Sequence, residues 1–216
     1  MAGRGLFLPG YGARASAYAR GLPEGWTAVQ PPPLRRTGGS LDALAAWATE
    51  LVRRQPEPVV LAGHSTGGAV ALLAAAAAPG LVRALVLFSP AGLPLSRPYG
   101  KVVRQAVGNT VRGRYAPREV AASLADLLTA PRAGLRLGRS VGVLDLTETM
   151  ARVRDAGIPV TVVAATTDAL IPPAHCRRVA ELLGADYREV EGPGGHTWMY
   201  GRWERFGREI AGASPS

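Results

Sequence analysis

Residues 59–70 read VVLAGHSTGGAV, and the rest of the sequence is best understood from this stretch. Apolar, partly β-branched residues typical of a buried strand end in Gly63-His64-Ser65-Thr66-Gly67, and an alanine-rich stretch typical of a helix follows at once. The serine is either a polar residue in a tight connection or a hydroxyl that the turn presents. The choice depends on whether the chain supplies partners for Ser65.

Short apolar strands alternate with helical segments on both sides of this turn, which is the pattern of a mainly parallel α/β sheet. The predicted strands are residues 5–8, 26–30, 58–62, 83–88, 159–164 and 187–190. The predicted helices are residues 41–54, 66–78, 146–155, a helix opened by Pro172-Pro173, and residues 198–210. Residues 93–144 break the alternation. We therefore predict a single domain, residues 1–216, with residues 93–144 inserted after the fourth strand.

The composition is that of a globular protein, with 47% hydrophobic and 19% charged residues in a chain of 216. The start of the chain lacks the basic and apolar segments of a signal peptide. The longest apolar run, residues 69–78, is too short to span a bilayer. Cys176 is the single cysteine, which excludes an internal disulfide and fits a reducing compartment. We expect a cytoplasmic protein without stable membrane insertion.

The 25 basic and 16 acidic residues give a net charge of +9. Such an excess suggests an anionic partner, or it reflects only a composition rich in arginine. Residues 93–140 hold nine basic and two acidic side chains, so this segment carries most of the excess. Interleaved aromatic residues, which single-stranded nucleic acid would stack on, are limited there to Tyr99 and Tyr115. We therefore expect no nucleic-acid partner.

An activated serine needs a base that accepts its proton and a carboxylate that orients the base. Of the three histidines, His64 adjoins the serine, so its side chain should point elsewhere as a structural member of the turn. His175 lies one turn into a predicted helix, where an exposed or capping role is expected. His196 lies in GPGGHTW, directly after the last strand, where α/β proteins place their chemistry. His196 is the predicted base.

The predicted carboxylate is Asp168, in VTVVAATTDALIPP just past the strand 159–164. The alternative is that Asp168 caps the helix that begins near Pro172. The order of Ser65, Asp168 and His196 along the chain favours the catalytic interpretation, because serine hydrolases of one large fold class share it.

With these three motifs, GHSTG, TTDALIPP and GGHTW, the sequence resembles the α/β-hydrolase superfamily over nearly its whole length. The resemblance implies a mainly parallel sheet, here of about six strands and so reduced, and a small helical cap formed by residues 93–144. Compared with relatives, the chain begins at what is usually the third strand, which would leave residues 26–30 at an edge of the sheet. Glycine is expected at positions 63 and 67 because larger residues would clash with neighbouring backbone.

The resemblance also implies an oxyanion hole made of backbone amides, each typically worth about 3 kcal/mol of transition-state stabilisation. One donor is expected to be Thr66, which starts the helix after the turn. The second is expected from the loop after the first strand, where relatives often have His-Gly and this chain has Pro9-Gly10. Gly10 fits that pattern and Tyr11 is the predicted donor. No cofactor or metal is implied.

These residues predict a serine hydrolase that cleaves a small or medium-chain ester through an acyl-enzyme intermediate, with a small-molecule acyl substrate. One alternative is a thioesterase or acyltransferase acting on carrier-bound acyl chains, and another is a non-catalytic ligand receptor of the same fold. In the segment 93–144, the valines of 102–111 share a helical face with basic residues off it. The valines would line the acyl pocket, and the basic residues would meet an acidic carrier or anionic substrate, or would only face solvent.

Overall fold

The computed structural model describes residues 4–95 and 128–213. Its centre is a six-stranded sheet in the order β2-β1-β3-β4-β5-β6, in which every neighbouring pair is parallel. The strands are β1 (Gly5–Leu8), β2 (Trp26–Ala28), β3 (Val59–His64), β4 (Val82–Phe88), β5 (Val160–Ala165) and β6 (Asp186–Val190). The predicted mainly parallel sheet is confirmed, and β2 lies at its edge.

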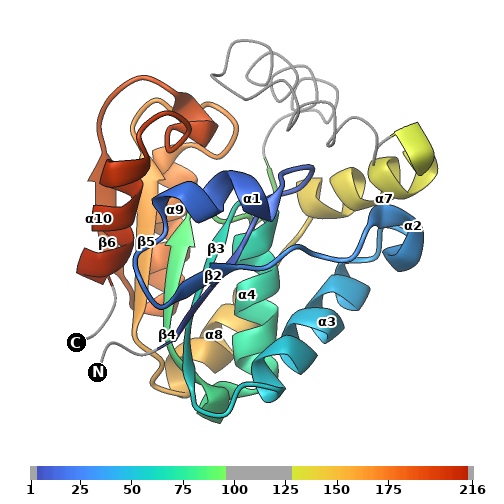
Figure 1. The fold of residues 1–216 in the computed structure, drawn as a ribbon, viewed down its shortest axis with the longest axis horizontal. Coiled ribbons are helices and arrows are strands. Elements are labelled where there is room, and N and C mark those ends of the chain that lie inside the picture. Colours follow the sequence, from blue (N-terminus) through green and yellow to red (C-terminus); the bar gives the residue numbers. More distant parts are fainter. Residues whose placement is uncertain (1–3, 96–127, 214–216) are drawn as a thin grey trace.

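Helices cover both faces of the sheet (Figure 1). One layer contains α3 (Leu41–Arg53), α4 (Thr66–Ala77), α8 (Thr147–Asp155) and α9 (Pro173–Leu183); the other contains α1 (Ala15–Tyr18) and α10 (Trp203–Ala213). The described residues also contain α2 (Leu34–Thr37), α7 (Pro131–Gly142), and the 3₁₀ turns Ala19–Gly21, Pro79–Leu81 and Gly195–Thr197.

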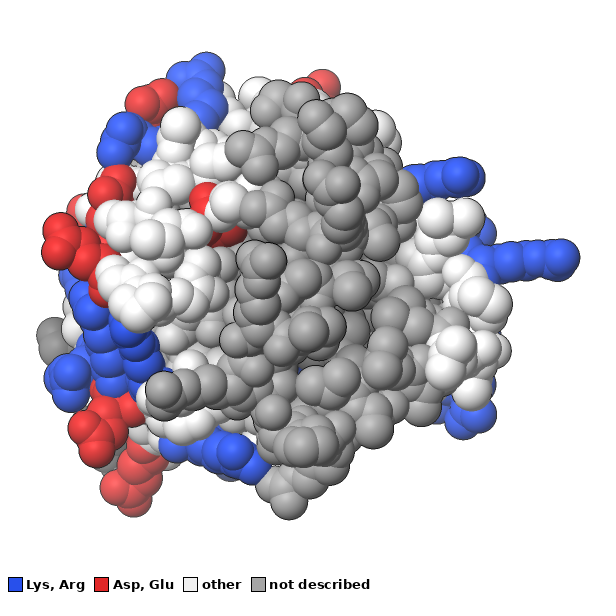
Figure 2. Space-filling model, turned by 90° about the horizontal axis from the view of Figure 1, so that it is seen from above, with Lys and Arg blue, Asp and Glu red and all other residues white. Residues whose placement is uncertain are grey.

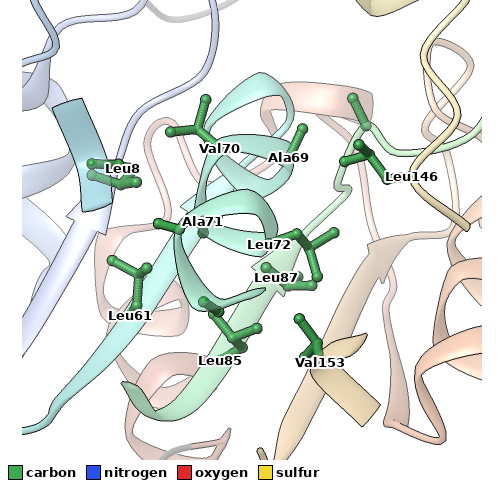
Figure 3. Close-up of a cluster of buried hydrophobic side chains, with 14 of the residues drawn as sticks. Leu8, Leu61, Ala69, Val70, Ala71, Leu72, Leu85, Leu87, Leu146 and Val153 are labelled. Atoms are coloured by element: carbon green, nitrogen blue, oxygen red, sulfur yellow. The ribbon is translucent and has the colours of Figure 1, made fainter. Parts of the chain in front are cut away.

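Alternation along the strands divides the core between these layers, because successive side chains of a strand point to opposite faces. In β3, Val59 and Leu61 pack toward α3 and α4, whereas Val60 and Ala62 pack toward α1 and α10. The helix α4 is apolar on every side, which suits a helix buried between the sheet, α3 and α8. Figure 3 shows Ala71 and Leu72 of this helix beside Leu61, Leu85 and Leu87 of the sheet.

The chain crosses from one side of the sheet to the other between β1 and β3. The chain leaves β1 to form β2 at the outer edge, then returns to form β3 on the other side of β1. Loops that follow two adjacent strands at such a switch point diverge and leave a crevice at the carboxyl ends of the strands, where α/β proteins bind ligands. The loop that begins at Pro9 and the turn at Ser65 therefore meet at this crevice.

Two predicted elements differ from those observed. The predicted helix 198–210 is instead a set of turns followed by α10, which begins at Trp203; Gly201 has a φ of 80°, a conformation that interrupts a helix. The predicted strand 26–30 ends at Ala28, two residues before the three prolines that follow it. Within 93–144, α7 forms near the end, and the valine face of 102–111 lies outside the described residues. Among the helices of residues 4–95 and 128–213, none is long and apolar enough to cross a membrane.

Candidate active site

Ser65 lies at the junction of β3 and α4 in a strained backbone conformation, with φ 56° and ψ −119°. A non-glycine residue rarely adopts a positive φ, and such strain persists only where the surrounding structure enforces it. A Cβ atom at Gly63 would overlap the Gly67 carbonyl oxygen, and one at Gly67 would overlap the Leu8 carbonyl oxygen. The expectation that positions 63 and 67 require glycine is confirmed. Ser65 itself is partly exposed, at the amino end of α4.

His196 and Asp168 are joined by a buried hydrogen bond of 2.8 Å between His196 Nδ1 and Asp168 Oδ2. The Asp168 side chain is fully buried and that of His196 is 7% exposed. Because a carboxylate only accepts, His196 Nδ1 carries the hydrogen and the Nε2 atom of the neutral ring is left as the acceptor.

The second carboxylate oxygen of Asp168 holds its own loop. Asp168 Oδ1 accepts hydrogen bonds from the amides of Leu170 and Ile171, both at 2.9 Å. Both amides precede α9, whose N-cap residue is Pro172 and which has no side-chain cap, so Asp168 does not cap that helix. Asp168 instead holds its own loop and binds His196 at once. Burial alone would raise the pKa of this carboxyl, but the electrostatic interaction and hydrogen bond with His196, together with the Ile171 amide, hold the pKa below its usual value.

His64, next to Ser65, connects the turn to two other parts of the chain. The Tyr18 hydroxyl lies 2.8 Å from His64 Nδ1, and His64 Nε2 lies 2.9 Å from the carbonyl oxygen of His196. Desolvation by burial, with the nearby His196 ring, lowers the pKa of His64 to about 3. His64 is therefore neutral: its Nε2–H donates to the His196 carbonyl, and its Nδ1 accepts from Tyr18. The expectation of a structural role for His64, pointing away from the serine, agrees with these contacts.

Sequence reasoning missed Tyr18. This tyrosine is fully buried in the four-residue helix α1 and stacks near Phe7 and Phe206 on the α10 side of the sheet. Its hydrogen-bond partner, His64, lies 46 residues away in the chain, so no local sequence pattern predicts the contact.

The residues expected to form the oxyanion hole come together around Ser65. A Cβ atom at Gly10 would lie 3.3 Å from the Ser65 Cβ atom, so the loop after β1 passes directly against the nucleophile candidate. Gly10, Tyr11 and Thr66 line one small pocket beside Ser65. Thr66 is the first residue of α4, where backbone N–H groups have no partner within the helix and attract negative charge.

His175 and Cys176 lie near Asp168 but do not bond to it. The expectation that His175 is an exposed or capping residue was wrong: its ring is half-buried, its Nε2 atom is buried, and burial lowers the pKa of the ring. The Cys176 thiol is fully buried, which raises its pKa and leaves it unreactive. Within the part of the chain that the structure describes, no cluster of three or more His, Cys, Asp or Glu side chains could hold a metal ion.

A larger groove of about 440 Å³ lies away from these residues, between the carboxyl-terminal halves of α3 and α4 and beside Arg152 of α8. Small side chains, chiefly alanines, form much of its lining. Ser65 lies at the opposite end of α4 from Ala76 and Ala77 of this groove, so the groove takes no part in the site.

A parallel sheet with a strained serine between β3 and α4, and a buried histidine–carboxylate pair after later strands, defines the α/β-hydrolase class of fold. The chain belongs to the alpha/beta hydrolase family, whose model matches residues 6–209.

Among curated proteins, an uncharacterized protein of Mycobacterium bovis is 29% identical over 174 residues, which cover 64% of this chain. The match covers 50% of that relative, so the chain spans about half the length of the curated relatives it matches.

Solved structures that share the fold include the following two. An N-acyl homoserine lactone degrading enzyme superposes with a TM-score of 0.74 at 17% identity, covering 98% of this chain and 93% of that one. A lipase-esterase related protein of Clostridium acetobutylicum superposes with a TM-score of 0.69 at 16% identity, covering 98% of this chain and 94% of that one. At these identities the likeness is one of fold.

Proposed function

We propose that this protein is a serine hydrolase that cleaves esters of small or medium-chain acids through an acyl-enzyme intermediate. The observation that carries the proposal is the buried bond between His196 Nδ1 and Asp168 Oδ2, together with the strained Ser65. Enzymes of the same fold that degrade lactones or are related to lipases and esterases support the choice of an ester bond.

In this mechanism His196 Nε2 takes the proton of the Ser65 hydroxyl as its oxygen attacks the acyl carbon. Asp168 holds the ring in the tautomer that leaves Nε2 free to accept and stabilises the imidazolium that forms. The amides of Tyr11 and Thr66 bind the negative oxygen of the tetrahedral intermediate. His196 then returns the proton to the leaving alcohol, and water, activated by the same ring, releases the acid.

The test combines covalent labelling with turnover. A fluorophosphonate probe should label wild-type protein at Ser65, and p-nitrophenyl esters should be hydrolysed. The variant Ser65→Ala should lose both labelling and turnover while keeping its unfolding transition. Labelling that persists in Ser65→Ala would show that another residue is the nucleophile. A folded wild type that neither labels nor turns over any ester or thioester would favour a ligand receptor.

One observation favours a second candidate, a thioesterase or acyltransferase for carrier-bound acyl chains. The exposed face of α7 presents Arg132, Leu135, Arg136 and Arg139, and α2 beside it presents Arg35 and Arg36. Figure 2 shows basic side chains projecting on the side where Figure 1 draws α2 and α7. A basic surface with an exposed apolar residue is complementary to an acidic carrier protein.

The two candidates differ in their response to charge. If a carrier binds at α7, the double variant Arg132→Gln, Arg136→Gln should slow turnover of a carrier-bound thioester and flatten its salt dependence. Turnover of a free p-nitrophenyl ester should stay unchanged. If the double variant changes turnover of the two substrates equally, the arginines do not bind a carrier and only face solvent.

A further inference from the structure

A small pocket extends from the Ser65 turn into the layer of α3 and α4. It lies between the loop after β1, the exit of β2, α3, the first turns of α4, and α7. Its lining is apolar at the buried end and more polar where it opens to solvent. The buried apolar lining consists of Leu8, Leu34, Leu44, Val70 and Leu137, with the half-buried Trp47 beside them; Gln30 and Tyr11 are exposed, and Arg14 is half-buried.

The pocket begins where an acyl carbon bound to Ser65 would lie. Gly10, Tyr11, Thr66 and Gly67 are part of its wall, and Gly10 packs against the Ser65 side chain. An ester whose carbonyl oxygen points at the Tyr11 and Thr66 amides would therefore have one of its two arms at the mouth of this pocket.

The position of His196 decides which arm enters. The leaving group must lie within reach of His196, which protonates it. His196 contacts His64 with ring centroids 4.6 Å apart, and His64 bonds Tyr18 on the α1 and α10 side of the sheet. The buried end of the pocket extends toward α3 and α4, on the opposite side of the sheet, and His196 is not part of the pocket wall. The alcohol arm therefore stays beside His196, and the acyl arm lies in the pocket.

The pocket limits the chemistry of that arm. Its buried end offers only aliphatic and indole surface, which favours a hydrocarbon chain. The pocket encloses about 60 Å³. This space is small, so it suits a short chain better than a long one. Resting on the proposed serine hydrolase mechanism, we infer that this pocket is the acyl site and that it selects short acyl groups, with Trp47 forming its limiting wall.

The experiment measures kcat/KM for p-nitrophenyl esters from acetate to dodecanoate. The wild-type value should be highest for short acyl groups and should decline as the chain outgrows the pocket, because one methylene group too many in an apolar pocket costs about 10-fold or more. Trp47→Ala should enlarge the pocket and raise the ratio of octanoate to butyrate turnover at least about 10-fold. Val70→Leu, which fills the pocket from α4, should shift the preference toward acetate.

The matched control is Trp203→Ala, the same substitution at another half-buried tryptophan, in α10 on the opposite face of the sheet. This variant should lose stability without changing the chain-length ratio. Fluorophosphonate labelling at Ser65, run on every variant, distinguishes a failure of the acyl site from a failure of the proposed function. An unchanged chain-length profile in labelled Trp47→Ala and Val70→Leu would overturn the acyl site alone. A wild type that does not label at Ser65 would overturn the proposed function and the acyl site with it.

Discussion

Acid should destabilise this protein through His64 well above the pH at which carboxylates titrate. In the native state, burial holds the pKa of His64 at about 3, whereas in the unfolded chain the ring has an ordinary pKa of about 6.5. Between these values the unfolded state binds a proton that the native state does not. Stability due to His64 is therefore fully present above pH 6.5 and is lost as the pH falls toward 3.

The size of the effect follows from the two pKa values. Each pH unit inside the window is worth about 1.4 kcal/mol, so lowering the pH from 7 to 5 should cost about 2 kcal/mol through His64 alone. Urea unfolding of the wild type at both pH values measures the total loss. In His64→Gln, whose amide does not titrate, the loss between pH 7 and 5 should be smaller by about 2 kcal/mol.

The comparison variant is His175→Gln, because this ring also has a lowered pKa but is only half-buried. It should remove a smaller part of the pH dependence. An equal loss of stability in wild type and His64→Gln would show that His64 does not cause the pH dependence. NMR of the histidine rings gives an independent answer in the wild type: the His64 ring should remain neutral at pH 5, and a charged His64 ring there would contradict its burial and its bond from Tyr18.

Three further outcomes are expected from the same contacts. Asp168→Asn should lower kcat for a p-nitrophenyl ester by about 10²–10⁴-fold, because His196 loses its carboxylate partner. His175→Ala should change kcat little, since His175 makes no bond to Asp168. Equal losses of kcat in the two variants would contradict the assignment of Asp168 as the catalytic carboxylate. Tyr18→Phe should lower the free energy of unfolding by about 1–3 kcal/mol, measured by urea titration, because it leaves the buried His64 Nδ1 without a donor. Gly67→Ala should destabilise by about 1–3 kcal/mol or more, while Gly80→Ala, with open space around it, stays within about 0.5 kcal/mol in the same titration.

Local sequence patterns predict the sheet and the turn at Ser65 well, because both depend on signals within a few residues. Apolar runs bounded by glycine and proline place β1 at its observed bounds and β3 within two residues. The Gly-His-Ser-Thr-Gly turn follows from the close approach of backbone at positions 63 and 67, which any larger side chain would block.

Such local patterns do not predict contacts between distant segments. The bond from Tyr18 to His64 and that from His64 to the His196 carbonyl join segments 46 and 132 residues apart. The pocket proposed as the acyl site likewise needs α2, α3, α4 and α7 to converge, and no periodicity along one helix predicts which of its side chains will face a cavity. The start of α10 at Trp203 depends on a single glycine, Gly201, whose positive φ is a property of the folded chain.

The two edges of the sheet bear on how copies of this protein behave at high concentration. At one edge, β2 is three residues long and leads into three consecutive prolines, which offer no N–H groups to a further strand. At the other edge, β6 begins with the exposed Asp186, whose charge disfavours pairing with a further strand. Both edges therefore resist aggregation by strand addition, and we expect any assembly of native copies to use helical surfaces.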